Sequence, residues 1–314
     1  MTIQLPLTLR VAAASMVAES TRELVLVRAD GGPLPGWQPG AHIDLEAGAV
    51  VRQYSLCGEP ARADEWRVAV LRDPASRGGS AFLVESLVVG AEIRAGGPRN
   101  NFQLERAESY LFIAGGIGIT PMLPMFRQVV ASGTRARFVY GARNEAAMSY
   151  REELITLGGD AVEFYPQDRH GMLDLSRLLR SVDRATVVYC CGPEGLLAAV
   201  EAQCDARGIE LRLERFAPRP LGAVIDRPVE LTLADSGITL TVPPEQTILD
   251  AVQQAGVFVL SNCEEGTCGT CITNVLDGVP EHRDSYLSDE EQASNDVMMI
   301  CVSRAKSARL TLDL

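Results

Sequence analysis

The stretch YLFIAGGIGITPMLPMFRQVVAS, residues 110–132, places an apolar strand, a glycine-rich turn and a helical segment in immediate succession. Four further strand-like runs follow it, ARFVYGA, VEFYP, TVVYCC and ELRLERF, and helical stretches separate them. Strands that alternate with helices in this way imply βαβ units, and therefore a parallel, doubly wound sheet. We expect the first helix of this sheet to begin at Pro121.

The flanking segments show different patterns of strand-like runs and turn residues. Residues 1–105 contain short β-rich runs broken by Gly and Pro, which is typical of a small antiparallel barrel. Beyond the parallel-sheet segment, VELTLADSGITLTVP predicts a hairpin, and Thr247 predicts the cap of a short helix that ends at Gly256. The predicted organisation is a barrel domain at 1–105, a nucleotide-binding domain at 106–218, a linker at 219–228 and a C-terminal domain at 229–314.

Composition narrows the class of protein. The chain has 314 residues, 46% hydrophobic and 22% charged, which suits a globular protein of several domains. No apolar run approaches the roughly 20 residues that cross a bilayer, and the N-terminal MTIQLPLTLR lacks the features of a signal peptide. We therefore expect a cytosolic protein. The net charge of −12 argues against a nucleic-acid or anionic-membrane partner.

Four cysteines near the C-terminus follow the spacing C-x4-C-x2-C-x29-C. They are Cys263, Cys268, Cys271 and Cys301. This is the plant-type [2Fe–2S] spacing, in which four thiolates hold two bridged irons. Gly266 and Gly269 would let the loop fold over such a cluster. A structural zinc site is the alternative, although zinc motifs usually pair thiols as C-x2-C twice.

The other cysteines give weaker signals. Cys57, Cys190 and Cys204 stand in apolar contexts, where cysteine commonly serves as a small buried hydrophobe. Cys191 ends a predicted parallel strand, which is the edge where open α/β sheets bind ligands.

Two glycine turns favour a dinucleotide site. Glycines 115, 116 and 118 would allow a close approach of the backbone, and the helix that follows offers free N–H groups to a pyrophosphate. The loop is not the G-x-G-x-x-G fingerprint, so a tight structural turn remains an alternative. YCCGPEG, residues 189–195, repeats the strand–turn–helix arrangement, and the two turns could flank one nicotinamide. Arg143, after the second strand, could meet a 2′-phosphate or an adenosine diphosphate group.

The barrel segment contains RQYSL, residues 52–56, and RDPASRGGS, residues 72–80. A flavin needs a cation and N–H groups for its phosphate, an aromatic face for its ring and polar contacts at its reactive nitrogen. Arg52, Tyr54 and Ser55 are groups of these kinds. The glycine turn precedes AFLVESL, a candidate helix, and so could cradle a phosphate. The alternatives are Tyr54 as barrel core and Arg77 as a solvated charge.

In this order, RxYS, RGGS, GGIGITP, CGP and C-x4-C-x2-C...C together resemble the phthalate dioxygenase reductase family, which includes vanillate demethylase reductases. The likeness spans nearly the whole chain, including HRD at residues 282–284 and the tail CVSRAKSARLTLDL. It implies an antiparallel FMN-binding β-barrel, a doubly wound α/β NAD-binding domain and a C-terminal β-grasp ferredoxin domain.

The resemblance also implies roles for single residues. Ser55 would lie near the reactive nitrogen of FMN, Thr120 between flavin and nicotinamide, and Phe216 over the flavin, with ordinary core packing as the alternative for Phe216. The implied FMN contacts are Arg52, Gln53, Tyr54, Ser55, Val70, Leu71 and Arg72, with Arg77, Gly78, Gly79 and Ser80 at the phosphate. The implied nucleotide site comprises Gly115, Gly116, Gly118, Thr120, Pro121, Arg143, Cys191, Gly192 and Pro193.

Electron counting connects these sites. NADH delivers two electrons together as hydride and a [2Fe–2S] cluster accepts one at a time, so a flavin is needed to divide the pair. The resemblance implies a monomeric reductase that uses NADH and FMN and serves a Rieske-type oxygenase or O-demethylase. Transfer from a plant-type cluster at about −400 mV to a Rieske centre at roughly −150 to +300 mV is downhill. A cytochrome P450 partner, or a redox sensor without sustained turnover, stays open.

Acidic side chains near the cysteines are candidate docking groups. They are Glu264, Glu265, Asp289, Glu290 and Glu291. A merely solvated face explains them equally well.

Overall fold

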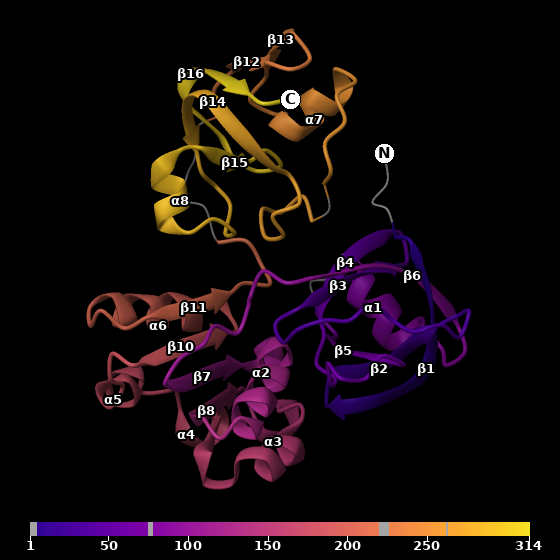
Figure 1. Ribbon diagram of the computed structural model, residues 1–314, viewed down its shortest axis with the longest axis vertical. Helices are drawn as coiled ribbons and strands as arrows, with labels where there is room; N and C mark the ends of the chain where they lie inside the picture. Colours follow the sequence, from indigo (N-terminus) through magenta and orange to yellow (C-terminus); the bar gives the residue numbers. More distant parts are fainter. Residues whose placement is uncertain (1–4, 75–77, 220–225, 262) are drawn as a thin grey trace. The chain divides into compact units, whose positions relative to one another are not determined.

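The protein is described here from a computed structural model that covers residues 5–74, 78–219, 226–261 and 263–314 (Figure 1). The chain divides into two compact units, one that ends at Glu214 and one that begins at Arg215. The first unit holds an antiparallel sheet and a parallel sheet, and the second holds a mixed sheet. Within the described ranges, no helix has both the length and the apolar character needed to cross a membrane.

The antiparallel sheet has the strand order β4-β3-β6-β1-β2-β5. Its strands are β1 (Leu7–Ala18), β2 (Thr21–Arg28), β3 (His42–Ala47), β4 (Val50–Ser55), β5 (Trp66–Leu71) and β6 (Glu92–Arg99). Leu56, directly after β4, pairs with Val68 of β5 in an isolated bridge. The two edge strands therefore meet, and the sheet closes on itself as the sequence predicts.

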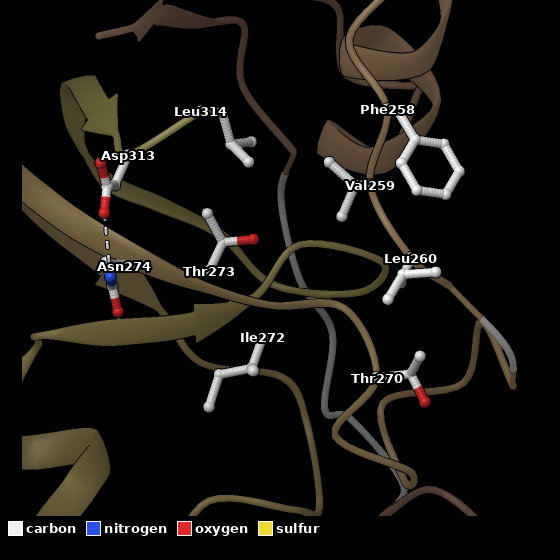
Figure 2. A pocket seen from close by; sticks show the side chains of 9 residues that line it. All are labelled: Phe258, Val259, Leu260, Thr270, Ile272, Thr273, Asn274, Asp313 and Leu314. Carbon is white, nitrogen blue, oxygen red and sulfur yellow. Dashed lines mark hydrogen bonds between the residues drawn. The ribbon is translucent and has the colours of Figure 1, made fainter. Parts of the chain in front are cut away.

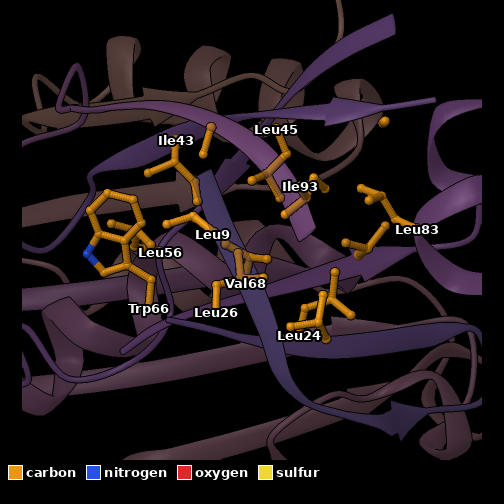
Figure 3. Close-up of a cluster of buried hydrophobic side chains, with 14 of the residues drawn as sticks. Leu9, Leu24, Leu26, Ile43, Leu45, Leu56, Trp66, Val68, Leu83 and Ile93 are labelled. Carbon is orange, nitrogen blue, oxygen red and sulfur yellow. The ribbon is translucent and has the colours of Figure 1, made fainter. Parts of the chain in front are cut away.

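Alternate residues of these strands fill the barrel, as Figure 3 shows for Leu9, Leu24, Leu26 and Ile43. Each of these side chains is fully buried, which is the period-2 pattern of a strand with one face on a core.

A short helix covers one end of the barrel core. It begins as α1 (Gly79–Ala81) and continues as the π-helix η1 (Phe82–Ser86), whereas the sequence predicts an ordinary helix from Ala81 onward. Arg22 Nη1 donates to three carbonyl oxygens of this segment, at distances of 2.8–3.1 Å. This guanidinium donates to carbonyl oxygens that the widened helical turn leaves without other partners.

The parallel sheet has the order β11-β10-β7-β8-β9. Its strands are β7 (Ser109–Gly115), β8 (Arg135–Ala142), β9 (Val162–Pro166), β10 (Thr186–Cys191) and β11 (Leu211–Glu214). The chain runs outward from the central β7 to β9 and then crosses to β10 on the other side of β7. The strand order thus reverses between β7 and β10, which is the point where doubly wound sheets bind ligands.

Helices cover both faces of the parallel sheet, because successive side chains of β7 enter two different cores. Phe112 packs in a cluster with Phe126 of α2, and Ile113 packs in a cluster with Leu197 of α6. The helices are α2 (Ile119–Ala131), α3 (Arg151–Gly158), α4 (Gln167–His170), α5 (Leu175–Arg180) and α6 (Glu194–Asp205), with 3-10 turns η2 (Gly116–Gly118), η3 (Glu145–Ala147) and η4 (Gly159–Ala161).

The first helix corrects the sequence prediction. Helix α2 begins at Ile119, two residues before the expected start at Pro121, because η2 leads directly into it. Pro121 fits there because the first turn of a helix has N–H groups without intrahelical partners, so the missing N–H costs nothing.

The mixed sheet of the second unit has the order β13-β12-β16-β14-β15, and only β12 and β16 run parallel. Its elements are β12 (Val229–Leu233), β13 (Ile238–Val242), α7 (Ile248–Gln254), β14 (Ile272–Glu281), α8 (Asp289–Ser294), β15 (Val297–Met299) and β16 (Arg304–Leu312). The predicted hairpin is confirmed as β12 and β13. Thr247 caps α7 by accepting from the Asp250 N–H at 3.0 Å, as predicted, and the unit is a β-grasp fold.

Candidate functional site

The switch point between β7 and β10 brings two glycine turns into contact. A Cβ on Gly118 would lie 2.1 Å from the carbonyl oxygen of Cys191, and one on Gly192 would lie 2.9 Å from Gly115 Cα. These glycines are therefore required for the two loops to touch. Gly116 differs, since its φ is 54° and nothing lies within 4 Å of a Cβ placed there. Of the four glycines in these two turns, Gly116 is the one that leaves room for a ligand.

The remaining nucleotide candidates lie around these turns. Thr120 is buried in the first turn of α2, where its hydroxyl donates to the Ile117 carbonyl oxygen at 3.0 Å, and Pro121 follows it. Cys191 is buried at the end of β10, and burial raises the pKa of its thiol well above the ordinary range. Pro193 precedes α6, and Arg143 is exposed after β8. All of them stand at the carboxyl edge of the sheet.

Glu214 also stands at this edge, and the sequence analysis missed it. It ends β11 directly opposite Cys191 in the parallel register. Its Oε2 atom is buried with no hydrogen-bond partner among the described residues, and burial raises the pKa of this carboxyl to about 8. The signal available in the sequence was an acidic residue at the end of the strand-like run ELRLERF.

The flavin candidates of the barrel gather around β4. Tyr54 is partly buried against the barrel core, and burial raises the pKa of its phenol to about 12. Ser55 is buried at the end of the strand, and Arg52 is half-buried two residues before Tyr54. A Cβ on Gly79 would lie 3.3 Å from Arg52 Cγ. The structure therefore places the glycine turn beside Arg52, one of the predicted flavin contacts.

Other members of this predicted set are held by neighbouring groups. Arg72 donates from Nε to Glu85 Oε1 at 2.6 Å, and Ser80 Oγ accepts from the Asp73 N–H at 3.2 Å. Gln53 Nε2 lies 3.5 Å from Asp44 Oδ1. Val70 is buried and Leu71 exposed at the end of β5, Gly78 begins the turn, and Arg77 lies outside the described residues.

The flavin and nucleotide candidates meet within the first unit, because β5 lies next to η2. The strand end at Leu71 and the open glycine turn at Gly116 thus belong to one region of the molecule. Phe216, predicted to cover the flavin, is exposed and belongs to the second unit.

The four cysteines of the second unit form two hydrogen-bonded pairs. The hydrogen bond with Cys268 lowers the pKa of Cys263 to about 4, and that with Cys301 lowers the pKa of Cys271, whereas the pKa values of Cys268 and Cys301 are raised. The backbone N–H groups of Glu265 and Thr267 both donate to Cys263 Sγ at 3.4 Å. Such donors stabilise a thiolate, which is the form that binds metal.

The glycines of this loop let it pack tightly. Gly266 and Gly269 have φ values of 71° and 74°, and a Cβ on Gly269 would lie 2.3 Å from the ring of Tyr286. Buried Asp284 holds the opposing segment by accepting from the N–H groups of Tyr286 at 3.2 Å and Leu287 at 2.8 Å. Asp284 of the HRD motif therefore fixes the segment, including Tyr286, on which the cysteine loop packs.

The pairing of the thiols bears on which metal centre they could hold. A structural zinc ion requires four ligands around a single point, whereas a bridged two-iron cluster takes two thiolates on each iron. Two pairs of thiols fit the two-iron centre better.

Two family models match parts of the chain. Residues 231–306 match the model of a 2Fe-2S iron-sulfur cluster binding domain, and residues 92–212 match the N-terminal domain of dimethylamine monooxygenase subunit DmmA-like proteins. The vanillate O-demethylase oxidoreductase of Pseudomonas sp. (strain HR199 / DSM 7063) is 40% identical over 97% of this chain and 98% of that protein.

Two solved structures extend the likeness to the fold. Phthalate dioxygenase reductase superposes with a TM-score of 0.70 at 34% identity, covering 98% of both chains. An intact type IV self-sufficient cytochrome P450 monooxygenase gives a TM-score of 0.89 at 40% identity, covering 98% of this chain and 41% of that one. This chain therefore spans about two fifths of that longer protein.

Proposed function

The chain belongs to the phthalate dioxygenase reductase family, and on that premise we propose that it carries electrons from NADH through FMN and a [2Fe–2S] cluster to a Rieske-type oxygenase or O-demethylase. As a member of this family it is an NAD(P)H-dependent oxidoreductase with a flavin-binding barrel, a nucleotide-binding domain and a ferredoxin domain. The proposed division is 1–105, 106–218, a linker at 219–228 and 229–314, in a monomeric, cytosolic protein.

The observation that carries the proposal is the arrangement of four thiols as two pairs. Cys263 and Cys268 would bind one iron, and Cys271 and Cys301 the other. All four would bind as thiolates, and the lowered pKa values of Cys263 and Cys271 favour that form at one thiol of each pair. The backbone donors to Cys263 would remain as hydrogen bonds to a bound sulfur.

The barrel residues would bind and orient the flavin. Bound flavin supplies the chemistry that accepts a hydride and releases electrons singly. Arg52 and the turn Gly78–Ser80 would hold its phosphate, because the guanidinium stem and the turn already touch. Tyr54 would lie against the ring and Ser55 would hydrogen-bond at its reactive nitrogen. Gln53, Val70, Leu71, Arg72 and Arg77 complete the proposed set.

The two glycine turns would hold the nicotinamide nucleotide beside the flavin. Gly116 faces open space, and so its backbone can approach a pyrophosphate. Thr120 and Phe216 are proposed at the flavin–nicotinamide contact. Gly115, Gly118, Pro121, Arg143, Cys191, Gly192 and Pro193 complete the proposed nucleotide set. Burial keeps the Cys191 thiol and, below about pH 8, the Glu214 carboxyl neutral, so neither adds a negative charge near the nucleotide.

A spectrum with chemical analysis tests the proposal. Protein produced with iron under anaerobic conditions should contain one flavin, two irons and two acid-labile sulfides per chain, and extraction should yield FMN. Titration should show reduction at lower concentrations of NADH than of NADPH. Protein without flavin or labile sulfide under these conditions would contradict the proposal.

A cytochrome P450 partner is the second candidate, because the likeness to a self-sufficient P450 monooxygenase covers 98% of this chain. Reconstitution with a Rieske oxygenase and with a separate P450, each supplied with NADH, distinguishes the two by which one forms product. A redox sensor would reduce ferricyanide and cytochrome c only slowly.

A further inference from the structure

The second unit has a groove beside the cysteine loop that is lined by both apolar and polar side chains, as Figure 2 shows. Its volume is about 400 Å³. Phe258 and Leu260, from the segment after α7, form one side, and Ile272 and Asn274 of β14 form the other. Thr270 closes the end nearest the cysteines.

The groove exposes large apolar side chains. Phe258 is 59% exposed, Leu260 57% and Ile272 44%. Because these three side chains surround one groove, they form an exposed apolar patch and are not isolated exposed residues. Exposed apolar patches mark interaction sites. Removing them from water would supply the favourable free energy for a contact.

The groove adjoins the proposed cluster ligands directly. Thr270 stands between Cys268 and Cys271 in the chain, and Ile272 follows Cys271. Val259, between the two exposed side chains of its segment, packs in the same core cluster as Cys271 and Cys301. A protein seated in the groove would therefore lie next to the segment that carries Cys268 and Cys271.

The charge of the molecule is concentrated in the same domain. Residues 229–314 contain 14 Asp and Glu against 4 Lys and Arg, a net charge of −10, whereas residues 1–228 have a net charge of only −2. Two of the four cations are held internally, since Arg283 pairs with Asp226 at 2.7 Å and Arg304 donates to the Arg227 carbonyl at 2.8 Å. Asp313 lines the groove itself.

We propose that this groove is the docking surface for the protein electron acceptor, which presents an apolar protrusion surrounded by Lys and Arg. The inference rests on the proposed function. An apolar centre with a charged periphery is the usual anatomy of a protein interface, and the opposite charges steer encounter and fix orientation. Contact at Ile272 and Thr270 would bring the acceptor close to the cluster, as single-electron transfer requires.

Cytochrome c, a basic protein acceptor, serves as the probe, with ferricyanide as the small-molecule acceptor. The variant Leu260→Gln alters the groove, and Leu276→Gln is its matched control because Leu276 is 56% exposed on β14 but does not line the groove. Leu260→Gln should raise the KM for cytochrome c about fivefold, an effect typical of an interface residue. Ferricyanide reduction and the rate of cluster bleaching by NADH should not change.

Equal KM values for cytochrome c in Leu260→Gln and Leu276→Gln would overturn the docking surface. Slower cluster bleaching by NADH in Leu260→Gln alone would overturn it too, by assigning the groove to a contact inside the chain. Failure of the wild-type protein to reduce either acceptor would reject the proposed function, and the docking surface with it.

Discussion

Two glycine-containing loops invite comparison, the cysteine loop of the second unit and the nucleotide turns of the first. In the cysteine loop, both glycines have positive φ and pack against neighbours, Gly266 on Val302 and Gly269 on Tyr286. In the nucleotide turns, Gly118 packs on Cys191 in the same way, yet Gly116 faces open space. Glycine therefore serves packing at most of these positions and leaves room for a ligand at one.

The difference shows why the two loops differ as sequence signals. Thiolates bind metal themselves, so the spacing of four cysteines predicts both the ligands and the type of metal centre. Glycines bind only through the backbone, and the sequence does not show whether the missing Cβ makes room for a ligand or for a neighbouring loop.

The largest effect is expected in the cysteine loop. Cys301→Ser removes one thiol of the second pair, and so should lower iron content and cytochrome c reduction at least about tenfold. Flavin content and ferricyanide reduction should persist. Iron and sulfide analysis together with both assays checks this, and Cys204→Ala, a buried thiol in α6, should keep its iron. Full iron content in Cys301→Ser would show that the cysteine spacing does not identify the cluster ligands, and the two loops would then be equally weak sequence signals.

Gly118→Ala tests packing in the nucleotide turns. Its methyl group would lie 2.1 Å from the Cys191 carbonyl oxygen, and backbone must move, so the free energy of unfolding should fall by about 2–3 kcal/mol. Denaturant unfolding measures it. The control is Gly195→Ala in α6, where nothing lies within 4 Å and where alanine should be neutral or slightly stabilising. Equal stabilities for the two variants would refute the packing role.

Gly116→Ala tests ligand approach. The methyl group meets no protein atom, but alanine at φ 54° costs about 1–2 kcal/mol, and the KM for NADH should rise several-fold. Gly133→Ala is the matched control, since Gly133 also combines a positive φ with open space but lies between α2 and β8. The two variants should lose similar stability, and only Gly116→Ala should change the KM. A KM change in both would assign the effect to strain.

Glu214→Gln should give the smallest effect, and one that depends on pH. The pKa of this carboxyl is raised to about 8, so the folded state holds a proton that the unfolded state releases near pH 4.5. Wild-type stability therefore falls as pH rises from about 4.5 to about 8. Glutamine carries no charge, so its stability should not fall over this pH range and should exceed that of the wild type above pH 8.

Melting temperatures of both proteins across that pH range measure the difference. Glu210→Gln, at an exposed carboxylate just before β11, should keep the wild-type slope. An unchanged slope in Glu214→Gln would show that this carboxyl is solvated in the folded protein.

The sequence by itself determined the barrel, the parallel sheet and the hairpin of the third sheet, because hydrophobic period and turn residues are local properties. The alternation after residue 110, the hairpin at β12 and β13 and the Thr247 cap all follow from neighbouring residues. The π-helical turn of η1 did not follow from neighbouring residues, since it depends on Arg22, which lies far from it in the chain. The start of α2 was misplaced by two residues because η2 leads directly into it.

For the site, the sequence determined which residues have the right chemistry, and the tertiary structure decided which of them meet. The cysteine spacing was sufficient to propose a cluster, but the pairing of Cys263 with Cys268 and of Cys271 with Cys301 arises from the folded loop. The sequence offered for Glu214 only an acidic residue in a strand-like run, and for the groove at Leu260 it offered no signal. Burial and proximity are set by segments far apart in the chain, and no local pattern encodes them.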